Sequence, residues 1–188
     1  MDAAASFRLT IDKPSLLRYA AVQSVIELCR AARIVHQSPR DTADPHVGRA
    51  KRISYPVHPA QAVDLTHKFD QDFVSAFLEV LNNIVLHAYR RAEAPIDVVG
   101  KFYADEVRVE ISHFGLRFDI DAIPAPDLES LPEGGMGLFI ARSLLDELHY
   151  YPSHDAAEFV VDTAPNATPH RWSLSKKLTE PNAQEISS

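Results

Sequence analysis

The sequence predicts an α+β fold in which helices cover one face of a largely antiparallel sheet. Apolar residues recur at helical spacing in two long segments, and segments of alternating polarity lie before and after them. A chain of 188 residues, 46% hydrophobic and 24% charged, suits one globular domain. We therefore expect a domain over residues 5–178, followed by a disordered tail over residues 179–188.

The first half of the chain predicts one strand, two helices and a long loop. Residues 7–11 alternate in polarity and predict a strand. Pro14 suits a helix start, and a helical pattern then runs over residues 16–34. Periodicity vanishes over residues 35–64, so we expect a loop there that is either functional or mobile. The second helix follows this loop and ends near Arg90.

The elements expected in the second half are shorter and mostly extended. Residues 96–102 and 107–112 predict an antiparallel pair with its turn at Ala104 and Asp105. A helix is expected over residues 136–148. Two further strands, over residues 158–162 and 170–178, are predicted to complete the sheet.

The composition argues against several classes of protein. A formal net charge of −7 leaves no dominant basic surface, which argues against a nucleic-acid partner. No apolar run approaches the roughly 20 residues that cross a bilayer, and the first residues lack the pattern of a secretory signal. The single Cys29 has no partner for an intrachain disulfide. We expect a cytoplasmic protein without a membrane segment.

One line of polar residues on the second helix is unusual. In the stretch 79-EVLNNIVLHAY-89, Glu79, Asn83 and His87 are spaced by four residues and form a stripe beside the broad apolar face. An acid and an amide one turn apart lie about 6 Å from each other along the helix axis. Two such groups could flank a single phosphoryl centre, and the alternative is a partly buried polar seam.

A second informative stretch is 133-EGGMGLFIARSLLDELHYY-151. Gly134, Gly135 and Gly137 lead directly into an amphipathic helix. Glycine lets a ligand approach the main chain closely, and a helix N-terminus offers free N–H groups that suit phosphate. A simple turn before a helix would use the same residues, so this stretch alone leaves both interpretations open.

Together these segments resemble the Bergerat-fold ATPases, the superfamily of gyrase, heat-shock chaperones, histidine kinases and mismatch-repair proteins. The stretch EVLNNIVLHAY is similar to their N box, in the version ending in His-Ala-Tyr of the anti-sigma-factor serine kinases of bacterial partner-switching systems. GGMGLFIARSLLDEL is similar to the second glycine box, and ISHFGLRFDI occupies the place of the first. The resemblance implies a two-layer α/β sandwich, with helices on one face of a mixed, mostly antiparallel sheet.

The resemblance also implies roles for individual residues. Asn83 would hold Mg²⁺ against the phosphates of ATP, and Glu79 would accept the proton of an incoming serine hydroxyl. His87 and Tyr89 are expected to shape the end of the helix and its packing. The cofactor-binding set would be Asn83, His113, Gly115, Gly134, Gly135, Met136, Gly137 and Leu138.

The first glycine box departs from the family pattern. His113 stands where the family has an Asp that accepts the exocyclic amine of adenine, and Arg117 replaces the second glycine. A neutral imidazole could accept a hydrogen bond from that amine with one nitrogen, whereas a protonated ring could not. ATP binding should therefore be weaker than in ordinary family members, and weaker at about pH 6 than at about pH 8.

Two hypotheses of function follow. In the first, the protein is an anti-sigma factor with serine/threonine kinase activity, which sequesters a sigma factor and phosphorylates an anti-anti-sigma antagonist using ATP and Mg²⁺. In the second, the nucleotide site has degenerated, and the same fold is a non-catalytic binding module for sigma factor or antagonist. The resemblance further implies a homodimer, with residues 7–34 as the candidate self-contact.

Overall fold

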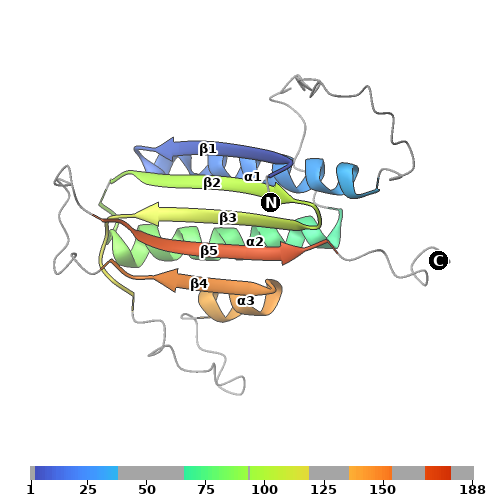
Figure 1. Cartoon of the computed structure of the whole chain (residues 1–188). Coiled ribbons are helices and arrows are strands. Elements are labelled where there is room, and N and C mark those ends of the chain that lie inside the picture. The colour runs from blue at the N-terminus through green and yellow to red at the C-terminus, as the bar shows by residue number, and fades with distance from the viewer. Residues whose placement is uncertain (1–2, 38–65, 93, 119–135, 154–167, 179–188) are drawn as a thin grey trace, which may run out of the picture.

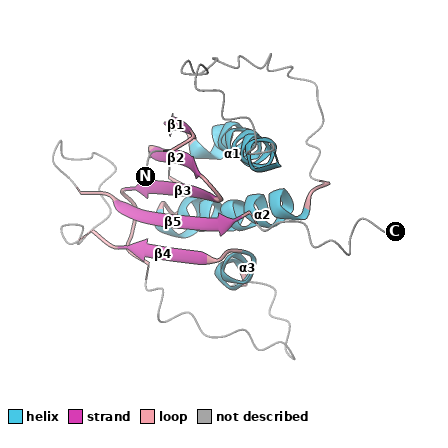
Figure 2. Cartoon of the chain, turned by 45° about the vertical axis from the view of Figure 1, so that its right-hand side comes forward, coloured by secondary structure: helices cyan, strands magenta, loops and turns pink. Residues whose placement is uncertain are grey.

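Five strands form a single sheet, and all the described helices lie on one of its faces (Figure 1). The computed structural model describes residues 3–37, 66–92, 94–118, 136–153 and 168–178. The rotated view separates the helical layer from the strands (Figure 2). The predicted two-layer α+β fold is thereby confirmed.

The strand order in the sheet is β1-β2-β3-β5-β4, and each neighbouring pair is antiparallel. The central pair is the predicted hairpin, with its turn at residues 104–105. Strand bounds are β1 Ala5–Ile11, β2 Ile96–Tyr103, β3 Glu106–His113, β4 Glu147–Tyr151 and β5 His170–Lys177.

The helical layer consists of α1 (Pro14–Gln37), α2 (Lys68–Asn83) and α3 (Gly137–Leu144). Helix α2 continues directly into η1 (Ile84–Ala88), a turn of π-helix. The core lies between this layer and the sheet. Alternate residues of β2 and β3 are buried beneath the helices, as period-two side-chain geometry requires. The opposite side of these two strands is only partly buried.

A buried ion pair joins α1 to α2. Asp70 is fully buried, and Arg33 reaches it with two hydrogen bonds of 2.9 and 2.6 Å, from Nε to Oδ1 and from Nη2 to Oδ2. This bidentate geometry satisfies both carboxylate oxygens, which a buried charge requires. The pair fixes the N-terminal half of α2 against α1.

Some expected boundaries are wrong. The helix predicted over 136–148 ends at Leu144, and residues 147–151 form β4, an edge strand paired with β5. The extended conformation already begins at Leu145, where φ is −106° and ψ is 155°. Helix α1 extends to Gln37, into the expected loop 35–64. Among the described strands every pairing is antiparallel, so the expected mixed sheet is not found there.

Other predictions concern residues outside the described ranges. They include most of the loop 35–64, the strand over 158–162 and the tail over 179–188. Within the described ranges, no helix is both long enough and apolar enough to span a membrane.

Candidate functional site

The junction of α2 and α3 brings three of the predicted site residues together. A Cβ atom placed on Gly137 would lie 2.5 Å from Glu79 Oε2 and 3.1 Å from Asn83 Nδ2. A side chain at the first position of α3 would therefore meet the carboxylate of Glu79 and the amide of Asn83, and the Glu79 side chain would have to move to admit it. The N-terminus of α3 therefore faces the stripe predicted on α2.

The side chain of Asn83 is oriented by its own helix. Its Nδ2 donates a 2.7 Å hydrogen bond to the backbone carbonyl of Glu79, one turn earlier. Since the amide nitrogen is engaged in this way, Oδ1 is the atom of the side chain left for a ligand. Both Glu79 and Asn83 are partly exposed. An acid and an oriented amide oxygen thus lie at the surface beside a helix N-terminus.

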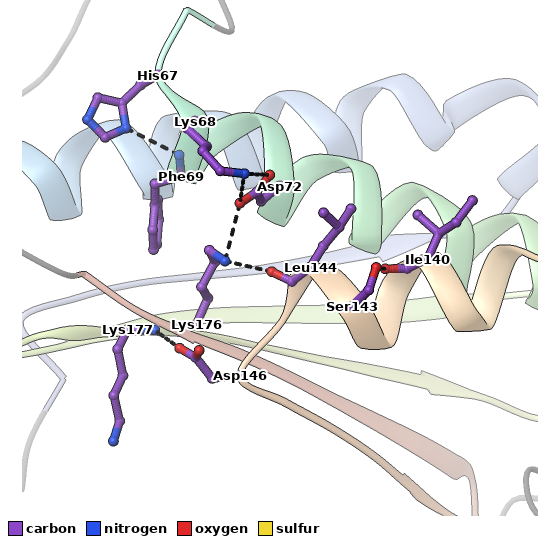
Figure 3. A network of polar contacts seen from close by, with 10 residues as sticks. All are labelled: His67, Lys68, Phe69, Asp72, Ile140, Ser143, Leu144, Asp146, Lys176 and Lys177. Atoms are coloured by element: carbon purple, nitrogen blue, oxygen red, sulfur yellow. Dashed lines mark hydrogen bonds and ion pairs between the residues drawn. The ribbon is translucent and has the colours of Figure 1, made fainter. Parts of the chain in front are cut away.

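A polar network fixes the other end of α3 (Figure 3). Lys176 of β5 donates a 2.6 Å hydrogen bond to the carbonyl of Leu144, the last residue of α3, and its Nζ lies 3.4 Å from Asp72 Oδ2 in α2. A cation at a helix C-terminus also complements the helix dipole. Because Asp72 lies near the start of α2 and Asn83 at its end, α3 runs antiparallel to α2. This arrangement places Gly137 opposite Glu79.

The π-turn η1 connects the helix to the loop after β3. The amide of Tyr89 donates to the carbonyl of Ile84, five residues back, and the carbonyl of Ala88 accepts a 2.9 Å bond from Leu116 N–H. A Cβ on Gly115 would lie 2.7 Å from that same carbonyl oxygen and 2.6 Å from the Tyr89 ring. The glycine of the first glycine box is needed for this close approach.

The side chain of Tyr89 also holds the loop after β3 in place. It is fully buried, its hydroxyl donates to the carbonyl of Pro95, and the hydroxyl oxygen accepts a 3.3 Å bond from Phe114 N–H. Burial raises the pKa of Tyr89 to about 12, so the phenol remains neutral. The expectation that Tyr89 packs the helix end is confirmed. His87 is exposed on η1, so the same expectation is wrong for it.

His113 is the last residue of β3 and is fully buried. Its Nδ1 accepts a 3.2 Å bond from Gly115 N–H. Burial, and to a lesser degree the neighbouring His170, lowers the pKa of His113 from 6.5 to about 3. The neutral ring therefore carries its proton on Nε2 and offers a donor there. The expectation that His113 accepts a hydrogen bond from the adenine amine is therefore wrong, because its accepting nitrogen is already used by Gly115 N–H. Since the ring is neutral at both pH values, the expected loss of ATP affinity between about pH 8 and about pH 6 is wrong as well.

Aromatic rings enclose His113. The rings of His170, Tyr89, Phe118 and Tyr150 have centroids 5.2, 6.0, 6.1 and 6.5 Å from its own. His170 is its cross-strand neighbour on β5, and its stacking on Tyr150 extends the cluster to β4. This set of rings was missed from the sequence, because it depends on β4 and on the pairing of β3 with β5.

The family of the chain follows from its sequence profile. Residues 43–161 match the histidine kinase-like ATPase domain. The chain belongs to this family. The match covers α2, η1, β2, β3, α3 and β4, which carry Glu79, Asn83, His113 and Gly137, and it leaves out β1, α1 and β5.

Individual relatives of this ATPase domain include a bacterial protein kinase. The chain is 29% identical over 101 residues to the serine-protein kinase RsbW of Bacillus cereus strain B4264, and equally so to that of Bacillus thuringiensis subsp. konkukian. The corresponding protein of Bacillus mycoides is 28% identical over 101 residues. In each case the alignment covers 50% of this chain and 62% of the relative.

Four residues of the predicted cofactor-binding set remain: two lie at the start of α3, and two lie outside the described residues. Met136 is the residue before α3, and its carbonyl accepts a 2.9 Å bond from Ile140 N–H. Leu138 is buried in the core. Gly134 and Gly135 lie outside the described residues. Within the described ranges, no three His, Cys, Asp or Glu side chains converge as a metal site.

Proposed function

We propose that the chain is an anti-sigma factor with serine/threonine-protein kinase activity, which binds ATP with Mg²⁺ and phosphorylates an anti-anti-sigma antagonist. The observation that carries this proposal is the seating of Gly137 against Glu79 and Asn83. The likeness to the serine-protein kinases named above supports it further. By that likeness, the protein would sequester a sigma factor and exchange it for the antagonist, as a cytoplasmic homodimer.

The residues at this junction fit a magnesium-bound triphosphate. The N-terminus of α3, which lies beside Glu79 and Asn83 at Gly137, offers free N–H groups that can hold phosphate oxygens. Asn83 Oδ1 is a hard oxygen ligand of the kind that Mg²⁺ takes. When bound, Mg²⁺ would neutralise phosphate charge and so favour transfer of the terminal phosphoryl group.

Glu79 would act on the incoming hydroxyl. It lies one turn before Asn83 and borders the same glycine, so its carboxylate can hold the hydroxyl of a serine near the terminal phosphate. Glu79 would accept the hydroxyl proton as the oxygen attacks the terminal phosphorus, while the bond from that phosphorus to the bridging oxygen breaks and ADP leaves. The helix supplies the rigidity that such positioning needs, since α2 is packed on the core along one whole side.

The proposal is tested by measuring binding and transfer separately. Calorimetry with Mg-ATP would give the affinity, and radiolabelled ATP with a purified anti-anti-sigma protein would give the rate of phosphorylation. Glu79→Gln should keep ATP affinity within a few-fold and lower transfer by about 10²–10⁴-fold. Asn83→Ala should weaken Mg-ATP binding as well. Glu147→Gln, an exposed change in β4, is the matched control.

A homodimer is a separate part of the proposal. Tyr19 and Ile34 are exposed apolar side chains of α1 within the segment predicted for self-contact, and the exposed Val35 follows directly after it. Such side chains favour an interface when they gather on one element. A monomeric mass in sedimentation at tens of micromolar would exclude this dimer without affecting the proposed chemistry.

A non-catalytic binding module is the second candidate, and one observation favours it. His113 is enclosed by aromatic rings where the family has an Asp that accepts a base amine. If the wild-type chain binds no Mg-nucleotide yet still binds the antagonist in the same assay, the module is the correct function.

A further inference from the structure

Lys176 occupies a position of β5 that the alternation of the strand assigns to the core. Trp172 and Leu174, four and two residues earlier, point to the helix-covered face and are fully buried. Lys176 follows in the same alternation, pairs across the sheet with the buried Val107, and has a side chain that is only 19% exposed. Lysine is seldom buried to this degree unless it is paired, so its presence at a core position needs an explanation.

Both partners of Lys176 belong to the helical layer. Its Nζ donates a 2.6 Å hydrogen bond to the carbonyl of Leu144, the last residue of α3, and lies 3.4 Å from Asp72 Oδ2 on α2. One ammonium group thus joins β5, α2 and α3 (Figure 3). Asp72 is 13% exposed and also accepts hydrogen bonds from Lys68, whose side chain is 82% exposed. Two lysines share this carboxylate, and within the described ranges only Lys176 also bonds to α3.

The chain just beyond α3 is held by the same part of β5. Asp146 N–H donates a 3.1 Å bond to the carbonyl of Ser175, and Asp146 Oδ2 accepts a 2.6 Å bond from Lys177 N–H. Together with the bond from Lys176 to the carbonyl of Leu144, these contacts fix the last residue of α3 and the residue two positions after it. The C-terminal end of α3 is therefore anchored to the sheet.

The length of α3 allows this anchored end to set the position of the other end. The helix has eight residues, so Gly137 and Leu144 lie about 11 Å apart along its axis. Because a short helix moves as a unit, release of Leu144 would let α3 slide along α2. The fit at Gly137 is close, since a Cβ there would lie 2.5 Å from Glu79 Oε2. A misplacement of about 1 Å near a reacting centre can lower a rate roughly 100-fold.

We propose that Lys176 and Asp72 are positioning residues for phosphoryl transfer. They fix α3 along α2, so that Gly137 stays beside the acid and the amide of the candidate site. Both residues act through the backbone of α3, at the end of the helix away from the phosphoryl centre. This inference rests on the proposed kinase function and adds two residues to it that lie outside its binding and catalytic set. The alternative is a charge pair that only stabilises the fold.

Lys176→Met and Lys68→Met form a matched pair of variants. Each removes one lysine from Asp72 and leaves the other lysine as a partner for the carboxylate. Phosphorylation of a purified anti-anti-sigma protein is measured at saturating Mg-ATP, at a temperature where urea unfolding shows each full-length protein to be folded. We expect Lys176→Met to lower the transfer rate at least about 10-fold, because α3 loses its anchor. Lys68→Met removes an exposed ion pair and should stay within about 2-fold of the wild type.

Two further variants separate positioning from stability. Lys176→Arg keeps a cation that can reach both the carbonyl of Leu144 and the carboxylate of Asp72, and it should restore transfer to within about 3-fold of the wild type. Asp72→Asn keeps the shape of the side chain and removes its charge. It should lower transfer at least about 3-fold, and it carries the test if Lys176→Met does not fold. A charge pair that only stabilises the fold would move the urea midpoint and leave the transfer rate of the folded protein unchanged.

The outcomes separate this inference from the proposed function. Equal transfer rates in the wild type and Lys176→Met, or in the wild type and Asp72→Asn, overturn the positioning role and leave the kinase standing. An equal fall in Lys68→Met and Lys176→Met also overturns it, because the effect would then come from the charge around Asp72 rather than from α3. Absence of both Mg-ATP binding and transfer in the wild-type chain overturns the kinase and the positioning role together.

Discussion

Burial of His113 should make the stability of the domain fall as the pH is lowered below about 6.5. The folded ring has a pKa of about 3, because burial and the neighbouring His170 disfavour its charged form. In the unfolded chain the ring is solvated and binds a proton near its ordinary pKa of 6.5. Between these two pKa values the unfolded state binds more protons than the folded state, so acid stabilises the unfolded state.

The magnitude follows from the two pKa values. Stability should be fully present above the unfolded pKa, and one such group loses about 1.4 kcal/mol per pH unit in the middle of the window. From about pH 7 to about pH 5 the loss is about 2 kcal/mol. A folded pKa one unit higher changes this figure little, since the ring would still be neutral at pH 5. His170, whose pKa is lowered as well, should add a loss of the same sign.

Urea unfolding at the two pH values measures this loss, and a variant isolates the contribution of His113. His113→Asn retains an acceptor for Gly115 N–H but does not titrate. The wild-type protein should lose about 2 kcal/mol more than His113→Asn, because the other titrating groups contribute equally to both. His149→Asn, at an exposed position, should behave like the wild type. Equal losses in wild type and His113→Asn would refute the buried neutral imidazole.

Three further perturbations test contacts elsewhere in the fold. Gly137→Ala introduces a Cβ 2.5 Å from Glu79 Oε2, so calorimetry should record at least about 10-fold weaker Mg-nucleotide binding with unfolding free energy changed by under about 1 kcal/mol. Arg33→Met leaves Asp70 buried and unpaired and should cost about 3–5 kcal/mol in urea unfolding, most of which Arg33→Met/Asp70→Leu should restore. Tyr89→Phe removes a hydroxyl that both donates and accepts, and thermal unfolding should report a loss of about 1–3 kcal/mol. An unchanged midpoint for Tyr89→Phe would mean that these bonds are replaced by solvent.

The helical part of the candidate site was readable from local sequence. Apolar spacing identified α2, and a polar stripe beside an apolar face identified Glu79 and Asn83 as residues that needed an explanation. Glycines before an apolar helix identified the turn at Gly137. Each of these signals lies within about one or two helical turns, which is the range over which periodicity carries information.

The edge strand β4 was missed because two periodicities overlap. Leu144, Leu145 and Leu148 continue the helical spacing of α3, so the helix appears to run on. The stretch 147-ELHYY-151 also alternates in burial, and it carries two aromatic residues that favour strands. Pairing with β5 decides between the two, and that strand begins 19 residues after β4 ends. Local propensity could not supply this information.

The properties of His113 could not be read from the sequence for a related reason. Its position in the motif showed that an acid had been replaced, and the free ring suggested an acceptor that titrates near neutral pH. The tautomer depends on one backbone N–H, and the pKa depends on burial by rings from β4 and β5. Both are tertiary properties, so the sequence identified the right residue with the wrong chemistry.

The π-turn η1 connects two regions of the candidate site that depend on different elements of the fold. Glu79 and Asn83 depend on α2 and α3, whereas His113 depends on the sheet. Their connection runs through the backbone, from Ala88 carbonyl to Leu116 N–H, and through the Tyr89 hydroxyl. Backbone bonds do not specify the side chain at position 113, so that residue can change without displacing the helix.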